Sequence, residues 1–230
     1  NRGISKGEIF LNIFDIIGPV MIGPSSSHTA GAVRIGLISR KLLGEAPKNA
    51  QILLHGSFAD TGKGHGTDRA LIAGLLGLKP DDSNIPMSFS LAEKEGLHFS
   101  FGTIHLKGAH PNTAVLRLEG VTGKTLEIEA SSIGGGQIQV CKLDGIETNF
   151  SGDYHTLIVH NLDRPGHVAQ VTTVLSQRNV NIARMQLYRN VLGGYAVMVI
   201  ECDQKIPEDV VTWLTKLDGI IKVTYLNIEE

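Results

Sequence analysis

The pattern of apolar and polar positions is clearest in the last third of the chain. Four short apolar runs there predict β-strands, and they cover residues 155–160, 181–188, 195–201 and 220–226. A helical stripe lies between the first two runs and consists of Val168, Val171, Val174 and Leu175. A second helix begins at Pro207, before the last strand. The predicted order is βαββαβ, the ferredoxin-like split βαβ arrangement.

The first 150 residues have a weaker periodicity. They predict two helices and five strands, at residues 28–43 and 68–76, and at residues 51–55, 97–106, 113–119, 125–130 and 137–143. The glycine-rich stretch 56–67 is predicted to be a flexible loop. We expect an α+β protein in two domains. The first, residues 1–152, is an α/β domain with a largely antiparallel sheet, and the second covers residues 153–230.

Composition and charge restrict the function. The 230 residues have a formal net charge of −2, so neither nucleic acid nor an anionic membrane surface is an expected partner. No apolar run approaches the roughly 18 residues of a membrane span. Cys141 and Cys202 form no CxxC motif and no disulfide framework. We expect no metal site in this chain, a small-molecule ligand and a reducing, cytoplasmic location.

The stretch GPSSSHTAG, residues 23–31, precedes the first predicted helix. A helix N-terminus has about four N–H groups without intrahelical partners, and one serine suffices as a cap. Three serines followed by His28 and Thr29 supply further hydroxyl groups that fit a carboxylate or phosphate. Three interpretations stay open: a helix cap, an anion site, or a serine nucleophile beside its base, for which neighbours in sequence are weak evidence.

Two further stretches carry histidines between turn residues: HGSFADTGKGHGTD, residues 55–68, and GAHPNT, residues 108–113. The first matches neither the phosphate-binding P-loop nor the GxGxxG pattern. It holds Lys63 and His65 between glycines that let a ligand approach closely. Histidine transfers protons near neutral pH, so His65 and His110 are candidate bases, with an ordinary loop as the alternative for each.

A turn in the second domain, NLDRPG, opens the helix that follows the first strand there. We expect Asn161, Asp163 and Gly166 to lie close to Asn181, which stands at the start of the next strand. Free helix N–H groups would bind a carboxylate, and an Asp or Asn side chain would bind an ammonium group. This combination favours an amino-acid ligand.

These motifs together resemble a known family. The run DRPGxxxxVxxxLxxxxVNI, residues 163–182, resembles the ACT domain, the ligand-sensing module of amino-acid enzymes. Before it, GPSSSHTAG, GSFADTGKGHGTD, HPNT and SIGGG occur in that order. The whole chain thereby resembles the beta chain of the bacterial two-chain iron–sulfur L-serine dehydratase. That family's first domain is related to the allosteric substrate-binding domain of some phosphoglycerate dehydrogenases.

The resemblance implies an ammonia-lyase that removes water from L-serine and yields pyruvate and ammonia. A [4Fe-4S] cluster would act as the Lewis acid on the serine carboxylate and hydroxyl. The family holds this cluster in its alpha chain, which agrees with the two cysteines here, too few for three or four ligands. The implied protein is a cytoplasmic heteromer of alpha and beta chains, and the beta chain is not an enzyme alone.

The resemblance also implies site residues. A base must remove the weakly acidic Cα proton of serine, and we expect His65 in this role, with Lys63 adding positive charge. His28 and His110 are the alternative bases. The substrate would be bound or oriented by side-chain hydroxyl groups, those of Ser25, Ser26, Ser27 and Thr29.

The ACT turn departs from the pattern of serine-sensing domains. They usually carry HxNxPG, whereas this chain has Asn161 and Asp163 at the His and Asn positions and keeps Asn181. The domain therefore binds serine, binds another amino acid, or only dimerises the assembly. The alternative function for the whole chain is a non-catalytic amino-acid-sensing module. The regulatory half of a phosphoglycerate dehydrogenase is disfavoured, because that family lacks the SSSHT and GKGHGTD pair.

Overall fold

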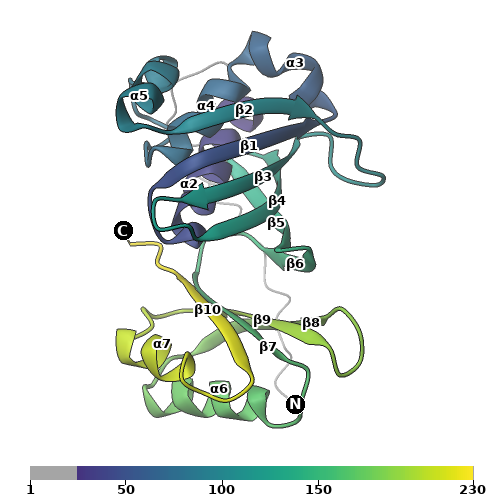
Figure 1. Ribbon diagram of the computed structural model, residues 1–230, viewed down its shortest axis with the longest axis vertical. Helices are drawn as coiled ribbons and strands as arrows, with labels where there is room; N and C mark the ends of the chain where they lie inside the picture. The colour runs from purple at the N-terminus through teal and green to yellow at the C-terminus, as the bar shows by residue number, and fades with distance from the viewer. Residues whose placement is uncertain (1–24, 230) are drawn as a thin grey trace, which may run out of the picture.

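The computed structural model describes residues 25–229, except for the side chains of residues 62–65. It contains two β-sheets, each with helices on one face (Figure 1). The six-stranded sheet has the order β2-β1-β3-β4-β5-β6, and the four-stranded sheet has the order β10-β7-β9-β8. The described strand pairs are antiparallel except for the parallel pair β1–β2. The expected α+β class with antiparallel-rich sheets is confirmed.

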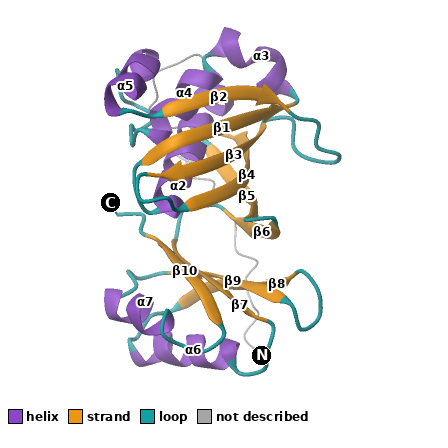
Figure 2. Cartoon of the chain, viewed as in Figure 1, coloured by secondary structure: helices purple, strands orange, loops and turns teal. Residues whose placement is uncertain are grey.

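The first unit combines the six-stranded sheet with the helices that lie behind it and near its upper edge in Figure 2. Its helices are the π-helix η1 (Ser26–Gly31), α2 (Ala32–Leu43), α3 (Ser57–His65), α4 (Thr67–Leu75), the 3₁₀-helix η2 (Ile85–Met87) and α5 (Ser88–Glu95). Its strands are β1 (Pro47–His55), β2 (His98–Thr103), β3 (Thr113–Gly120), β4 (Thr125–Gly134), β5 (Gln137–Leu143) and β6 (Ile146–Phe150).

The second unit has the predicted βαββαβ order. Its elements are β7 (His155–Leu162), α6 (His167–Gln177), β8 (Ile182–Arg189), β9 (Tyr195–Cys202), α7 (Glu208–Leu214) and β10 (Ile220–Leu226). Leu157, Val159 and Met198 of the sheet pack with the apolar stripes of both helices. The first unit ends with β6 at Phe150, and we propose that the domain boundary lies between residues 152 and 153, in the connection to β7.

Glycine lets α2 and α4 pack at backbone contact. A Cβ atom on Gly74 would lie 2.0 Å from the carbonyl oxygen of Val33, and one on Gly36 would lie 2.3 Å from that of Leu71. Such distances leave no room for a methyl group between the two backbones. This close pair covers the inner face of the sheet, where Ile52, Leu116 and other apolar side chains are fully buried.

The prediction for residues 56–67 was wrong in one respect. The glycine-rich stretch is not a loop: residues 57–65 form α3, and α4 begins at Thr67 directly after Gly66. Glycine weakens a helix by roughly 1 kcal/mol per residue, so intrinsic propensity alone does not predict α3. Tertiary contacts at its first turn, described below, favour the helix. The short elements α5 and β6 were also not predicted.

The four-stranded sheet packs on the first unit through the face that α6 and α7 leave uncovered. Ile158, Val197, Val199 and Leu226 belong to the same buried apolar cluster as the side chains of the six-stranded sheet. Glu201 lies on this face with 2% of its surface exposed. Its Oε2 atom is 3.5 Å from Arg184, and its Oε1 atom has no hydrogen-bond partner among the described residues. Burial raises the pKa of the Glu201 carboxyl, despite Arg184.

The Glu201→Gln variant is expected to be more stable than the wild type near pH 7.5. Where the folded-state pKa of a carboxyl is raised, the folded state binds more protons than the unfolded state, so the free energy of unfolding falls as pH rises above the unfolded-state pKa. The side-chain amide of the glutamine carries no charge, so the variant does not lose free energy of unfolding in this way. Urea midpoints at pH 7.5 and pH 5 measure the effect.

The stability gain should be larger at pH 7.5 than at pH 5. The control is Glu95→Gln, since Glu95 is exposed at the end of α5. A midpoint difference between Glu201→Gln and wild type that is the same at both pH values would contradict a raised pKa at Glu201.

None of the helices among residues 25–229 has the length and apolar character needed to cross a membrane.

Candidate active site

Four of the sequence motifs meet at one end of the six-stranded sheet. The β-sheet register places His55, the last residue of β1, beside Thr113, the first residue of β3, and Thr113 beside Ser131 of β4. The π-helix η1 and its cap residue Ser25 carry the SSSHT residues, and η1 packs on β4, α3 and α4. The chain therefore brings SSSHTAG (residues 25–31), the start of GSFADTGKGHGTD, HPNT and SIGGG into one region.

Ser25 caps η1, as one of the three interpretations predicted. Its Oγ atom accepts a hydrogen bond from the backbone N–H of His28 at 3.1 Å. Ser26 and Ser27 form the first turn of η1 and are half-buried. A π-helix is rare and is found mostly as a single turn, frequently at functional sites. Its wide turn leads into α2 and places the His28 ring toward α3.

The His28 ring lies between two serine hydroxyl groups. Its Nδ1 atom is 3.4 Å from Ser25 Oγ, and its Nε2 atom is 3.1 Å from Ser57 Oγ, at the start of α3. The ring of Phe58 meets the imidazole edge-on, with ring centres 5.4 Å apart. Because a hydroxyl group can donate or accept a hydrogen bond, each imidazole nitrogen can exchange a proton with its serine hydroxyl group.

The HPNT turn contacts the start of α3. Phe58 donates its N–H to the carbonyl of Pro111 at 3.5 Å, and a Cβ on Gly56 would lie 2.6 Å from that same oxygen. Gly56 has φ +55°, so both its conformation and this close approach favour glycine. His110 is exposed, and its Nδ1 accepts the N–H of Asn112 at 3.1 Å.

His110 also borders a polar depression of about 580 Å³ on the outer face of the sheet. Ser131 and Cys141 of the first unit line the same depression, and Tyr188 of the second unit completes its wall. Thr113 Oγ1 links the HPNT turn to this wall, because it lies 2.6 Å from the carbonyl of His110 and 2.7 Å from Ser131 Oγ. Thus His28 faces the helical side of the sheet end and His110 borders the outer side.

Two buried hydroxyl groups, one in η1 and one in the facing strand β4, lack hydrogen-bond partners among the described atoms. They belong to Thr29, which is 4% exposed, and Ser132, which is fully buried. Ser132 packs on Gly31, where an added Cβ would lie 2.0 Å from Ser132 Oγ. A buried hydroxyl without a partner costs free energy, so such groups are uncommon away from functional sites.

Two predicted residues fall outside the described side chains. Lys63 and His65 belong to α3 by their backbone, and nothing is described of where their side chains lie. Conversely, Ser57 and Ser132 were not singled out by sequence reasoning. Both lie within motifs that were, Ser57 directly after Gly56 and Ser132 at the start of SIGGG. Their position inside these motifs was the available signal.

The second unit separates the residues predicted to bind an amino acid. Asp163 Oδ2 accepts the N–H of Gly193 at 2.9 Å and lies 3.3 Å from Arg189. Gly166, with φ +100°, is the N-cap residue of α6 at the same end of the sheet. Asn161 is buried there, and its Nδ2 donates to the carbonyl of Leu162 at 2.7 Å.

Asn181 lies at the opposite end of this sheet, so the expectation that it is close to the turn was wrong. Asn161 pairs with Ala196, whereas Ile182 pairs with Cys202, six residues further along β9. At about 3.4 Å per residue this is a separation of roughly 20 Å. The reason is topological: β8 runs parallel to β7, so it starts at the end where β7 starts.

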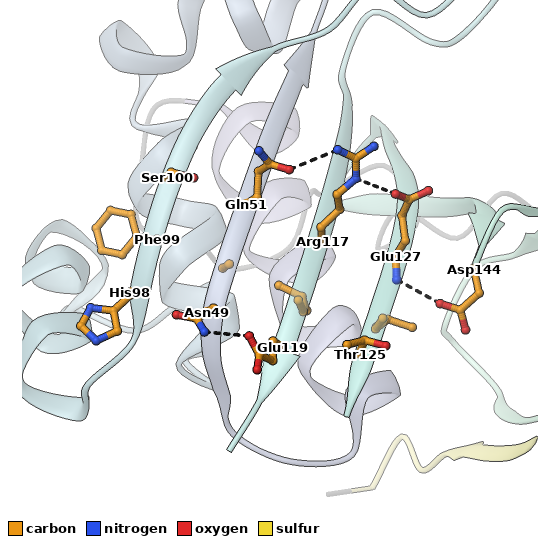
Figure 3. Close-up of a pocket in the computed structure, with 13 residues that line it drawn as sticks. Asn49, Gln51, His98, Phe99, Ser100, Arg117, Glu119, Thr125, Glu127 and Asp144 are labelled. Carbon is orange, nitrogen blue, oxygen red and sulfur yellow. Dashed lines mark hydrogen bonds and ion pairs between the residues drawn. The ribbon is translucent and has the colours of Figure 1, made fainter. Parts of the chain in front are cut away.

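A second open hollow, of about 570 Å³, lies on the outer face of the first sheet and holds none of the predicted residues (Figure 3). Five of its polar side chains are paired with one another. Arg117 donates to Gln51 and Glu127, and Asn49 donates to Glu119. Internally satisfied groups leave few free donors or acceptors to bind a ligand. The candidate site is therefore the end of the sheet at His28 and not its outer face.

The described residues do not fit an iron–sulfur cluster or another metal centre. No group of three His, Cys, Asp or Glu side chains among them could hold a metal ion. Cys141 lies on β5 and Cys202 on β9, and burial raises the pKa of both thiols, that of Cys202 to about 11. Clusters bind thiolates, so these two protonated cysteines on different sheets are unsuitable ligands.

Comparison with known proteins identifies relatives over nearly the full length. Residues 12–142 match the family of the serine dehydratase beta chain, and residues 155–219 match the ACT domain. The chain is 43% identical to a probable L-serine dehydratase beta chain of Bacillus subtilis, with 94% of this chain and 97% of the relative covered. It is 34% identical to the L-serine dehydratase beta chain of Peptoniphilus asaccharolyticus, with the same coverage.

A more distant relative is a D-3-phosphoglycerate dehydrogenase of Archaeoglobus fulgidus. It is 26% identical over 86% of this chain, and only 37% of that enzyme is covered. The similarity thus concerns one part of a larger protein.

Proposed function

This chain belongs to the family of serine dehydratase beta chains, carries an ACT domain, and on that premise we propose that it is the beta subunit of an L-serine dehydratase. The reaction removes the Cα proton and the hydroxyl group of L-serine as water. The resulting aminoacrylate tautomerises to an imine, and water hydrolyses the imine to pyruvate and ammonia. The observation in the structure that supports this function is the His28 ring between Ser25 and Ser57, where the motifs of the first unit meet.

The site provides groups for proton transfer and for binding a carboxylate. Removal of the Cα proton needs a positioned base, and imidazole is suited to this near neutral pH. The contacts of His28 favour it for this role. We also propose His65 and His110 as members of the same machinery, with Lys63 adding positive charge. The hydroxyl groups of the η1 turn would orient the substrate, those of Ser25, Ser26, Ser27 and Thr29.

The family's [4Fe-4S] cluster would act as a Lewis acid in the elimination. The described residues of this chain do not fit such a cluster, so we propose that an alpha chain holds it and that turnover requires both chains. The two cysteines that this chain keeps as free thiols agree with a reducing compartment, and we propose the cytoplasm.

We propose that the ACT domain binds an amino acid at the turn formed by Asn161, Asp163 and Gly166 and that it dimerises the assembly. Asn181 lies roughly 20 Å away within one chain, so it would reach such a ligand only from a second copy. The turn offers the α6 N-terminus for a carboxylate and the Asp163 carboxylate for an ammonium group.

The Asp163→Ala variant is expected to bind L-serine at the ACT turn at least tenfold more weakly than wild type. The substitution removes a charged partner for the ammonium group and a hydrogen bond to Gly193, which holds the β8–β9 connection. Calorimetric titration of the full chain with L-serine, with glycine as a second ligand, measures it. The control is Asp81→Ala, since Asp81 is an exposed Asp of the first unit, far along the chain from the turn. Equal affinities of Asp163→Ala and wild type would exclude the turn as the binding site.

The function itself is tested by reconstitution. The chain is co-expressed under anaerobic conditions with the cluster-bearing alpha chain, and pyruvate formation from L-serine is measured. The complex should release pyruvate, and either chain alone should not. An alpha chain that reaches the kcat of the complex by itself would make this chain a non-catalytic sensor.

A further inference from the structure

Ser57 was not among the residues predicted for the site, yet it makes the shorter of the two serine contacts to the His28 ring. Its Oγ lies 3.1 Å from Nε2, compared with 3.4 Å between Ser25 Oγ and Nδ1. The two contacts differ in origin. Ser25 precedes His28 by three residues in the same turn, whereas Ser57 is 29 residues further along the chain. Ser57 therefore ties the ring to a different element.

The backbone around Ser57 is held by several contacts. Ala59 and Asp60 donate their N–H groups to the carbonyl of Gly56, at 2.9 and 3.0 Å. The Thr61 hydroxyl donates to the carbonyl of Ser57 at 2.7 Å. Gly56 itself passes so close to Pro111 that a Cβ would lie 2.6 Å from its carbonyl oxygen. The position of the Ser57 hydroxyl is thus fixed by α3 and by the HPNT turn together.

The residue after Ser57 limits the ring on another side. Phe58 is fully buried, and its ring stands at 68° to the imidazole with the ring centres 5.4 Å apart. An aromatic edge contact of this kind is favourable and directional. One short segment thereby supplies a hydrogen-bond partner for Nε2 and an apolar wall for the ring, which leaves the imidazole few other orientations.

We propose that Ser57 is a positioning residue that fixes the orientation and protonated nitrogen of His28 for proton transfer from L-serine. This inference rests on the proposed function. The hydrogen bond made by one imidazole nitrogen determines whether the other nitrogen carries a proton. The Ser57 contact at Nε2 therefore decides whether Nδ1, which faces Ser25, is protonated. Because displacement by about 1 Å can cost 10²-fold in rate, Ser57 should affect kcat more than KM.

The test compares Ser57→Ala with Ser57→Thr, which keeps a hydroxyl group. In the complex with the alpha chain, Ser57→Ala should lower kcat about 10- to 100-fold with KM within about threefold, and Ser57→Thr should restore most of the loss. The control is Ser100→Ala, since Ser100 is exposed on the outer face of the sheet (Figure 3) and should leave kcat unchanged.

A second measurement does not depend on turnover. In the full chain labelled with ¹⁵N-histidine, the His28 Nε2 resonance, assigned by its absence in His28→Gln, should shift in Ser57→Ala and stay near its wild-type position in Ser57→Thr. An unchanged Nε2 resonance, or a kcat of Ser57→Ala equal to wild type, would overturn the proposal. If the wild-type complex makes no pyruvate, the proposed function fails, and the resonance still decides whether Ser57 orients His28.

Discussion

Replacing His28 by alanine is expected to lower the kcat of the complex for L-serine by about 10²–10⁴-fold, with a much smaller change in KM. This is the usual contribution of a positioned general acid–base group. The expectation follows from geometry: His28 is the described imidazole with both ring nitrogens within reach of hydroxyl groups at the junction of the motifs. Initial rates of pyruvate formation over a range of L-serine concentrations separate kcat from KM.

His98→Ala is the matched control, because His98 is an exposed histidine on the outer face of the sheet (Figure 3). It should keep the wild-type kcat. His65→Ala belongs in the same series, since His65 is the other candidate base. A wild-type kcat in His28→Ala together with a loss of 10²-fold or more in His65→Ala would assign the proton transfer to His65 and reject His28.

The second unit was predictable from sequence because its periodicities are local. Each strand and helix there reads from its own apolar pattern, and the predicted helix at residues 168–177 corresponds to α6 (His167–Gln177). The position of Asn181 was not predictable in the same way. It depends on the relative direction of β7 and β8. The crossover through α6 makes these two strands parallel, so Asn181 lies at the end of the sheet where β7 starts.

The first unit shows the limit of propensity. Gly62 and Gly64 weaken any helix, and the sequence around them predicts a loop. The α3 helix forms there nevertheless, anchored at its first turn by Pro111 and by the His28 contact. Both partners are distant in sequence, so no local pattern indicates them. Tertiary contacts thus decided this element, as they decided that Ser57 belongs to the site.

The candidate site was predictable as a set of motifs and not as an arrangement. The sequence indicates that GPSSSHTAG and HPNT carry polar groups, yet nothing in it states that His28 and His110 approach the sheet end from different sides. That follows from strand alternation: Ser131 and Ser132 are adjacent in β4 and therefore face opposite sides of the sheet. Ser131 meets Thr113, and Ser132 meets Gly31.

The contact between Gly31 and Ser132 leads to the second large effect. In Gly31→Ala the new Cβ would lie 2.0 Å from Ser132 Oγ and 2.7 Å from Ser132 Cβ. The backbone of Gly31 is helical, with φ −63° and ψ −40°, so alanine meets no conformational obstacle and the whole cost is steric. We expect a loss of about 1–3 kcal/mol in the free energy of unfolding. Because η1 must move away from β4, kcat should fall at least about tenfold.

Removing the opposing side chain should reverse this loss. Ser132→Gly deletes both atoms that the new Cβ meets. The loss in free energy of unfolding of Gly31→Ala/Ser132→Gly should therefore be smaller, by about 1 kcal/mol or more, than the summed losses of the two single variants. Urea denaturation of the four chains measures this coupling, and pyruvate formation by the four complexes measures whether activity returns with stability. Strictly additive free energies would show that η1 is not packed against β4 through this pair, and the junction of GPSSSHTAG with SIGGG would then be wrong.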